Sequence, residues 1–298
     1  MISGRATRPT HFFDTASPEA LFVIGGISQY TGAVIAVSLF DEIRPATVAW
    51  VRVIVAAIVI LAVSWRHQRT WTRRDLTSAA VFGVATALMN LFFYLAIDRV
   101  PLGKSVVIEF FGPIAIAAVL TRSRRNTAAL LLAVAGVLIL SGVEIGGEPL
   151  GLFFIFAAST MWAVYIVLGR RVASLDRGLS GLGVGLAIGA VAIAPFGMRG
   201  SLEVFTTPRL LGLCALVGVL STALAYGIDQ HVLRRIPIRR FALLLALLPV
   251  TAMIVGFLAL DQRPTAVDLL GAALVIAGVI VQERDELPPT TEMEVATA

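Results

Sequence analysis

The stretch YLAIDRVPLGKSVVIEFFGPIAIAAVL, residues 94–120, carries the strongest structural signal in the chain. It places Lys104, Glu109 and the pair Gly112 and Pro113 inside a run that is otherwise apolar. A carboxylate in such a run is costly in lipid unless a partner or a function holds it there. The surroundings of Glu109 therefore become the main question for the rest of the sequence.

The overall composition is that of a membrane protein. The chain has 298 residues, of which 58% are hydrophobic and only 14% are charged. Soluble domains carry about a quarter charged residues, so this chain lacks the polar surface that water requires. The net charge of +5 does not predict nucleic acid as a partner, because the basic residues form short clusters between apolar runs. We expect the lipid bilayer to surround the protein.

Continuous apolar runs predict the membrane-spanning helices. A helix needs about 20 apolar residues to cross a bilayer, and a β-barrel is excluded because the runs do not alternate. We predict an all-α integral membrane protein with ten transmembrane helices. Polar tails are expected at 1–19 and at 283–298, the latter disordered. The expected spans are 20–40, 46–65, 76–97, 102–121, 127–143, 150–169, 178–198, 209–231, 239–260 and 265–282.

The distribution of Lys and Arg predicts the orientation. Connections on the side of the amino terminus hold most of these residues, whereas the opposite side holds scattered ones such as Arg44, Arg99 and Arg263. Cytoplasmic connections carry this excess, so both termini are expected to be cytoplasmic in a bacterial inner membrane. The basic clusters lie at 66–75, 122–125, 170–177 and 234–240.

An internal repeat divides the chain into two halves. Pro101 and Pro113 have the same separation as Pro237 and Pro249, and a similar stretch precedes each pair. Each predicted half, 20–143 and 150–282, has five spans, so the second enters the membrane from the opposite side. Inverted repeats of this kind occur in secondary transporters, with the site between the halves near the midplane. The matching segments are YLAID (94–98) with YGID (226–229) and LAVAGVLIL (132–140) with LVIAGVIVQ (274–282).

Several intramembrane polar residues are expected at one depth. At about 1.5 Å per residue, Glu109 lies roughly 10 Å inside its span. Arg52 falls at a similar depth in the second span, and Asn90 does so in the third, with Tyr94 one turn away on the same face. These side chains predict a shared polar cavity, with Arg52 and Glu109 either as a structural ion pair or as a solute site. Lys104 is expected to extend to the outer interface.

Further polar and helix-breaking residues extend the candidate site. Gly112 with Pro113, and Pro249 in the second half, are candidate hinges, because proline removes a helical hydrogen bond; inert packing kinks are the alternative. The side chains of Asp229, Gln230 and His231 are expected near the cytoplasmic end of the eighth span. A second polar group could contact a solute or join helices, and it consists of Ser28, Gln29, Trp162 and Tyr165.

The sequence offers little for an enzyme. It contains no P-loop, no GxGxxG and no nucleophile elbow, and its three histidines are not spaced as metal ligands. Cys214 is the single cysteine, so no intrachain disulfide forms. We therefore expect no catalytic residues, no metal and no cofactor.

Several motifs in order resemble a known family. The chain resembles the drug/metabolite transporter superfamily, specifically its EamA-domain members, and within these the threonine/homoserine exporter group. The resemblance covers nearly the whole chain apart from the tails. It rests on SQYTGAVIAVSLF (28–40), the helix of Arg52, VPLGKSVVIEFFGP (100–113), MWAVYIVLGRR (161–171) and LSTALAYGIDQHVLRRIPIRRFALLLALLP (220–249).

The resemblance implies an exporter of small amino acids that is coupled to protons. Glu109 matches the carboxylate of the first half, whereas Leu248 stands where similar proteins often have a glutamate before the second-half proline. We therefore expect the chemistry to be concentrated in the first half. Export of another metabolite or drug, and a membrane scaffold or sensor without transport, remain alternatives. The expected partners are a small-molecule substrate, protons and lipid, and a homodimer is a possible assembly.

Overall fold

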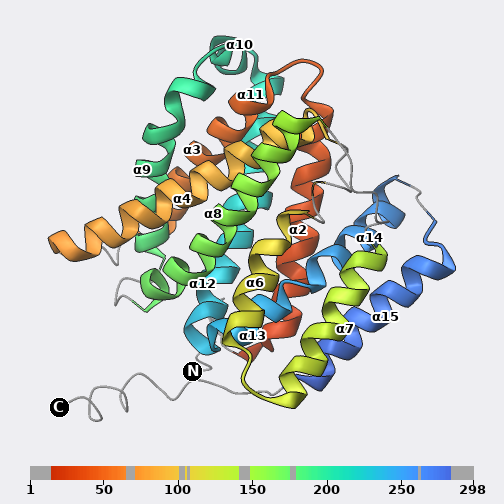
Figure 1. Cartoon of the computed structure of the whole chain (residues 1–298). Coiled ribbons are helices and arrows are strands. Elements are labelled where there is room, and N and C mark those ends of the chain that lie inside the picture. The colour runs from red at the N-terminus through yellow and green to blue at the C-terminus, as the bar shows by residue number, and fades with distance from the viewer. Residues whose placement is uncertain are drawn as a thin grey trace, which may run out of the picture.

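The computed structural model describes residues 15–64, 71–100, 105, 108–140, 148–174, 179–260 and 263–282. Lys104, the tail at 283–298 and most of the tail at 1–19 fall outside these ranges. Every regular element within them is a helix (Figure 1). The helices are α2 Pro18–Ser38, α3 Pro45–Ser64, α4 Arg73–Ile97, α6 Phe111–Leu120, α7 Arg124–Leu140, α8 Pro149–Ala173, α9 Ser180–Gly197, α10 Ser201–Thr206, α11 Pro208–Gly218, the π-helix η2 Val219–Leu224, α12 Ala225–Arg235, α13 Ile238–Leu244, α14 Leu247–Leu260 and α15 Ala266–Val281.

Proline and capping residues set where several helices begin. Helices α2, α8 and α11 start at Pro18, Pro149 and Pro208, where proline fits because the first N–H groups of a helix lack partners. The Oγ atom of Ser17 accepts a hydrogen bond from the amide of Ala20 at 3.2 Å. Local sequence therefore fixes these helix starts, and the apolar runs between them form the spans.

The all-helical prediction is confirmed, and several helices have membrane-spanning length. Within the described ranges, seven helical segments are long and apolar enough to cross a bilayer. Helices α6 and α15 are apolar but shorter. The predicted count of ten spans thus exceeds what helix length alone supports, because the fourth predicted span has a turn at Phe110 and because α7 and α15 have only 17 and 16 residues. The seven segments are Pro18–Ser38, Pro45–Ser64, Arg73–Ile97, Pro149–Ala173, Ser180–Gly197, Pro208–Arg235 and Ile238–Val255.

Two helix breaks occur where proline requires them. A proline cannot donate to the carbonyl four residues earlier and clashes with it. The chain turns at Phe110, just before α6 and its Pro113, and it turns again at Leu245 and Ala246, just before α14 and its Pro249. The sequence predictions of Pro113 and Pro249 as kink sites therefore fall beside actual breaks.

Glycines bring pairs of helices into close contact. A Cβ atom on Gly83 of α4 would collide with the backbone of Gly185 in α9. Where α7 and α15 lie side by side (Figure 1), a Cβ on Gly136 would lie 2.5 Å from the carbonyl oxygen of Gly271. One on Gly278 would lie 2.7 Å from the carbonyl oxygen of Ala129. Small residues at helix interfaces are typical of membrane proteins, where backbones must approach closely.

The helix contacts of residues 20–143 and of residues 150–282 correspond to each other. Helix α4 packs on α8 and α9, and the segment α11, η2 and α12 packs on α2 and α3. In the same way α2 packs on α14, while α8 packs on α6.

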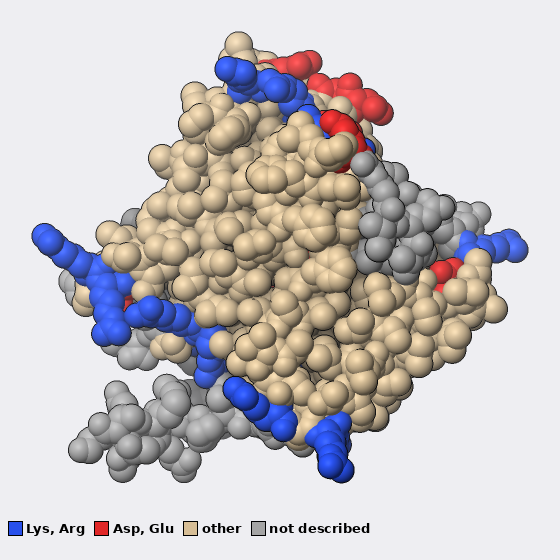
Figure 2. Space-filling model, viewed as in Figure 1, with Lys and Arg blue, Asp and Glu red and all other residues tan. Residues whose placement is uncertain are grey.

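In Figure 2, uncharged residues cover a broad belt, and charged residues gather along its lower and upper margins. A belt of this kind is the surface that lipid requires.

Candidate transport cavity

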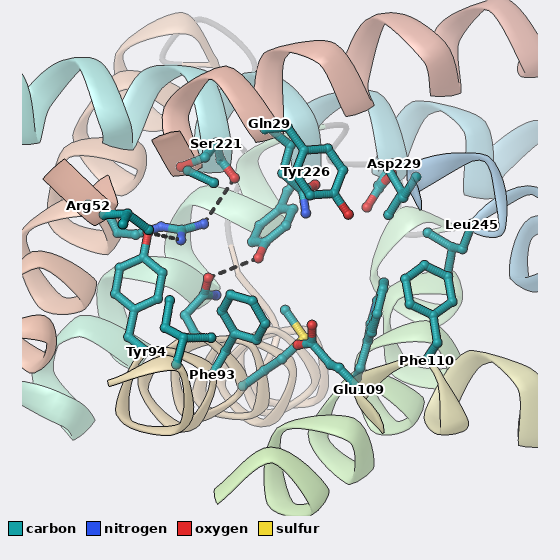
Figure 3. Close-up of a pocket in the computed structure, with 18 residues that line it drawn as sticks. Gln29, Arg52, Phe93, Tyr94, Glu109, Phe110, Ser221, Tyr226, Asp229 and Leu245 are labelled. Carbon is teal, nitrogen blue, oxygen red and sulfur yellow. Dashed lines mark hydrogen bonds between the residues drawn. The ribbon is translucent and has the colours of Figure 1, made fainter. Parts of the chain in front are cut away.

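A small cavity lies between the helices of both halves (Figure 3). Its volume is about 80 Å³, well below the roughly 300 Å³ at which pockets for drug-sized ligands begin. Its wall is mainly aromatic and aliphatic, with a few polar side chains. It is lined by Gln29, Tyr30, Ala33 and Val37 of α2, Arg52 of α3, Met89, Asn90, Phe93, Tyr94 and Ile97 of α4, Glu109, Phe110, Trp162 of α8, Ser221 of η2, Tyr226 and Asp229 of α12, Leu245 and Leu248.

Arg52 is held by both halves of the chain. Its side chain is only 5% exposed. The Nη1 group donates to the hydroxyl of Tyr94 at 2.7 Å, and the Nε group donates to Oγ1 of Thr222 at 2.8 Å. Nη2 donates to the carbonyl oxygen of Ser221 at 3.0 Å, and the guanidinium carbon lies 5.1 Å from the ring centroid of Tyr94. A buried cation requires this degree of hydrogen bonding, because desolvation penalises its charge.

The π-helix η2 supplies two of the three acceptors of Arg52, the carbonyl oxygen of Ser221 and Oγ1 of Thr222. A π-helix shifts the backbone hydrogen bonds by one residue, and such turns occur often at functional sites. The carbonyl of Ser221 accepts from Arg52, and the carbonyl of Leu220 accepts from Oγ of Ser28 at 2.7 Å. Ser28 therefore joins α2 to η2 and does not line the cavity. No sequence signal pointed to this irregular turn.

Glu109 faces the cavity without the partner expected for it. In the parts of the chain that the structure describes, it forms neither a hydrogen bond nor an ion pair with Arg52. Figure 3 shows Arg52 and Tyr94 on one side of the cavity, whereas Glu109 enters it from another. The predicted direct pairing is therefore not observed, because η2 and Tyr94 take up the guanidinium instead. The Glu109 carboxylate is left facing the cavity.

Asn90 and Tyr94 lie where the sequence analysis placed them, on one face of α4. The amide nitrogen of Asn90 donates to the carbonyl oxygen of Thr86 at 2.7 Å, and its oxygen accepts from the hydroxyl of Tyr226 at 3.1 Å. Tyr226 lines the same cavity as Arg52, Glu109 and Asp229. The hydrogen bond between Asn90 and Tyr226 therefore joins α4 to α12 at the cavity wall.

The remaining predicted residues divide into lining and supporting groups. Gln29 and Trp162 line the cavity, and Trp162 packs edge-on against Phe110 with ring centroids 5.0 Å apart. Tyr165 lies behind the wall, where it stacks on Phe82 and donates to Oδ2 of Asp229 at 2.8 Å. Trp162 and Phe110 therefore shape the cavity wall, and Tyr165 orients the Asp229 carboxylate from behind it.

Asp229 is the cavity residue that sequence reasoning missed. It was expected at an ordinary exposed helix end, because basic residues follow it closely. The helix instead continues to Arg235, which leaves Asp229 inside, where it faces the cavity in Figure 3. Its place three residues after Tyr226, one turn away on the same helix face, is the signal that could have identified it. A carboxylate from residues 150–282 therefore lines the cavity together with that of Glu109.

The candidate hinge residues pack tightly. A Cβ atom on Gly112 would collide with the carbonyl oxygen of Ser159 in α8, and Pro113 is buried beside it.

Glu109 and Asp229 are the two carboxylates that line the cavity. Among the described residues, no group of three or more His, Cys, Asp and Glu side chains could hold a metal ion.

Comparison with known proteins places the chain among transporters. Residues 149–282 match the EamA-like transporter family. The chain is 30% identical over 267 residues to the threonine/homoserine exporter RhtA of Salmonella typhimurium and to that of Escherichia coli strain K12. In both cases the match covers 87% of this chain and 89% of the relative. A crystal structure of another protein has the same fold, with a TM-score of 0.69 and 20% identity over 88% of this chain and 95% of the other.

These matches establish the class of the protein, a multi-pass transporter of the bacterial inner membrane. The chain belongs to the EamA-like transporter family of the drug/metabolite transporter superfamily. Within that superfamily it falls in the group that includes the threonine/homoserine exporters. The family resemblance expected from the motifs is confirmed.

Proposed function

We propose that the protein exports small amino acids or closely related metabolites, of the threonine and homoserine type, by alternating access. The observation that carries this proposal is the cavity, which has Arg52 at one side and two carboxylates, Glu109 and Asp229, elsewhere in its wall. An α-amino acid carries one negative and one positive group at a fixed separation. A cavity with both signs of charge and a volume of about 80 Å³ suits such a small zwitterion.

The two ends of the solute have separate binding groups in this proposal. A guanidinium has five N–H donors, and three hydrogen bonds fix the orientation of Arg52 while leaving donors for a carboxylate. The ammonium group lies between Glu109 and Asp229, whose carboxylate oxygens accept hydrogen bonds from its N–H groups. The rings of Trp162 and Tyr226 flank the solute and exclude water.

Ten spans in two inverted halves are part of the proposal. The α7 and α15 contacts support it, because Gly136 meets Gly271 while Gly278 meets Ala129. The same offset along the chain relates Gly136 to Gly278 and Ala129 to Gly271, so each contact is the symmetry mate of the other. On this arrangement the halves are 20–143 and 150–282, and both termini are cytoplasmic.

The mechanism we propose uses the helix breaks as moving joints. The breaks at Phe110 and at Leu245 with Ala246 occur at equivalent positions of the two halves and border the cavity. Val37 and Ile97, at the ends of α2 and α4 opposite the termini, also line it, and Val37 is 41% exposed. The cavity therefore faces the outside in this state. Protonation of Glu109 would release the ammonium, so that protons enter as solute leaves.

Flux measurements test the proposal. Purified protein is reconstituted into proteoliposomes, and movement of labelled threonine and homoserine is followed with and without an imposed pH gradient. We expect flux that exceeds that of empty liposomes and that responds to the gradient. Absence of flux for every amino acid tested, with protein shown to be folded, would overturn the exporter proposal; flux without any response to pH would overturn only the coupling.

A further inference from the structure

A second hollow lies at the ends of the helices, away from the transport cavity. It has a volume of about 240 Å³ and shares no lining residue with that cavity. The end of α9, the start of α3 and the last turns of α4 surround it. Its lining residues are Arg44, Ala46, Leu95, Pro195, Phe196 and Arg199. Two arginines thus border an otherwise apolar hollow.

Local structure brings these two arginines together from different parts of the chain. Arg44 directly precedes α3, and the Oγ1 atom of Thr47 in its first turn donates to the carbonyl oxygen of Arg199 at 2.9 Å. Gly200 has a positive φ of 83°, which turns the chain from α9 into α10. The Cδ atom of Arg44 lies 4.0 Å from where a Cβ on Gly200 would be. The side chain of Arg44 and the backbone of Arg199 therefore lie beside the same turn.

Two other arginines of this face have ion-pair partners. Arg99 pairs with Asp98 at 3.2 Å, and Arg209 pairs with Glu42. Within the described ranges, neither Arg44 nor Arg199 donates a side-chain hydrogen bond or forms an ion pair. Two like charges at one hollow repel each other, and an anion between them would offset that repulsion. Arginine binds phosphate oxygens with particular geometric preference, because its N–H groups form a planar fork.

The walls of the hollow indicate that the anion has an apolar part. Phe196 is 56% exposed, and Val191 of α9 and Leu202 of α10 are 75% and 74% exposed. These side chains continue the uncharged belt that faces lipid. The hollow therefore lies where an apolar surface meets two cations, which is the arrangement of acyl chains and headgroup in a phospholipid.

We propose that Arg44 and Arg199 form a binding site for the phosphate of an anionic phospholipid in the leaflet opposite the termini. The phosphodiester lies between the two guanidinium groups, and the acyl chains run along Phe196 and the exposed face of α9. The site does not depend on the proposed export activity. Because one arginine precedes α3 and the other follows α9, a bound lipid would also join the two predicted halves at this face.

The test compares lipid binding by matched variants of the full chain in detergent. Phosphatidylglycerol, phosphatidylcholine and inorganic phosphate are titrated separately, and bound lipid is counted by native mass spectrometry while Tm is recorded. The variants are Arg44→Gln, Arg199→Gln and the double substitution. Arg263→Gln is the control, because Arg263 is an exposed arginine outside the hollow.

We expect the wild type and Arg263→Gln to retain phosphatidylglycerol and to gain Tm from it. The double variant should lose that gain, with an apparent affinity at least about tenfold lower. Equal retention by the double variant would overturn the site. An equal response to phosphatidylcholine would overturn the selectivity for an anionic lipid, and an equal response to inorganic phosphate would show a simple anion site and overturn the assignment to lipid. None of these readouts involves transport, so they are independent of the export assay.

Discussion

The two halves proposed above break their helices at corresponding prolines but carry different side chains at the cavity. In the first half Glu109 lies four residues before Pro113; in the second half Leu245 lies four residues before Pro249. Both side chains line the cavity, yet only one is a carboxylate. The second half supplies its acid from a different helix, through Asp229 of α12. The helix breaks of the two halves therefore correspond, although their carboxylates stand at different positions.

The largest expected effect comes from the residue that joins the halves. Arg52→Lys keeps the charge but cannot reach Tyr94, Thr222 and the Ser221 carbonyl together. We expect loss of transport and a decrease of about 2–4 kcal/mol in the free energy of unfolding. Transport assays and denaturant unfolding in detergent measure both. The exposed Arg263→Lys is the control, and wild-type stability of Arg52→Lys would contradict the bridging role.

Glu109→Gln tests the carboxylate of the first half. The amide has nearly the same shape but cannot exchange a proton, so we expect loss of transport driven by a pH gradient with folding intact. Flux in proteoliposomes is compared with and without the gradient. A variant that responds to the gradient as the wild type does would make Glu109 structural.

A further test moves the carboxylate from position 109 to the corresponding position 245 of the other half. Glu109→Leu alone should abolish coupled flux, and the double variant Glu109→Leu with Leu245→Glu should restore part of it. The reason is that positions 109 and 245 both line the cavity at equivalent helix breaks. The measurement is the initial rate of labelled threonine efflux. No recovery in a folded double variant would argue that the two breaks are not equivalent.

The smallest effect is expected from Tyr165→Phe. The change removes the hydrogen bond to Asp229 but keeps the stacking on Phe82. We expect a loss of about 1 kcal/mol in stability or substrate binding, which corresponds to roughly a fivefold weaker affinity. Isothermal titration with the transported solute would measure it. A change larger than that of Glu109→Gln would show that Tyr165 has a more direct role.

Composition and periodicity sufficed for the fold class but not for its irregular parts. Apolar runs predicted the helical, multi-span architecture, and depth along the spans placed Arg52, Asn90, Tyr94 and Glu109 at one cavity. The sequence could not reveal η2, because a π-helix depends on tertiary partners such as Arg52, which donates a hydrogen bond to one of its carbonyl oxygens. For the same reason the partners of Arg52 were not predictable from the opposite charge of Glu109.

Asp229 was missed for a different physical reason. Charged residues close to a basic cluster usually lie in the interface, and the length of α12 beyond Asp229 was underestimated. Its repeat counterpart, Asp98 in YLAID, is indeed at the surface, where its side chain is 44% exposed and pairs with Arg99. The two matching aspartates therefore have opposite environments. Burial, which the repeat alone could not predict, separates a site residue from a surface one.

Transport by Asp229→Asn, with Asp98→Asn as the matched control, tests most directly whether both halves supply a carboxylate. The assay is the initial rate of labelled threonine and homoserine efflux from proteoliposomes that contain folded protein at equal density. The account predicts a loss of about tenfold or more for Asp229→Asn and a rate near that of the wild type for Asp98→Asn. A wild-type rate for Asp229→Asn would contradict it and return the chemistry of the cavity to the first half alone.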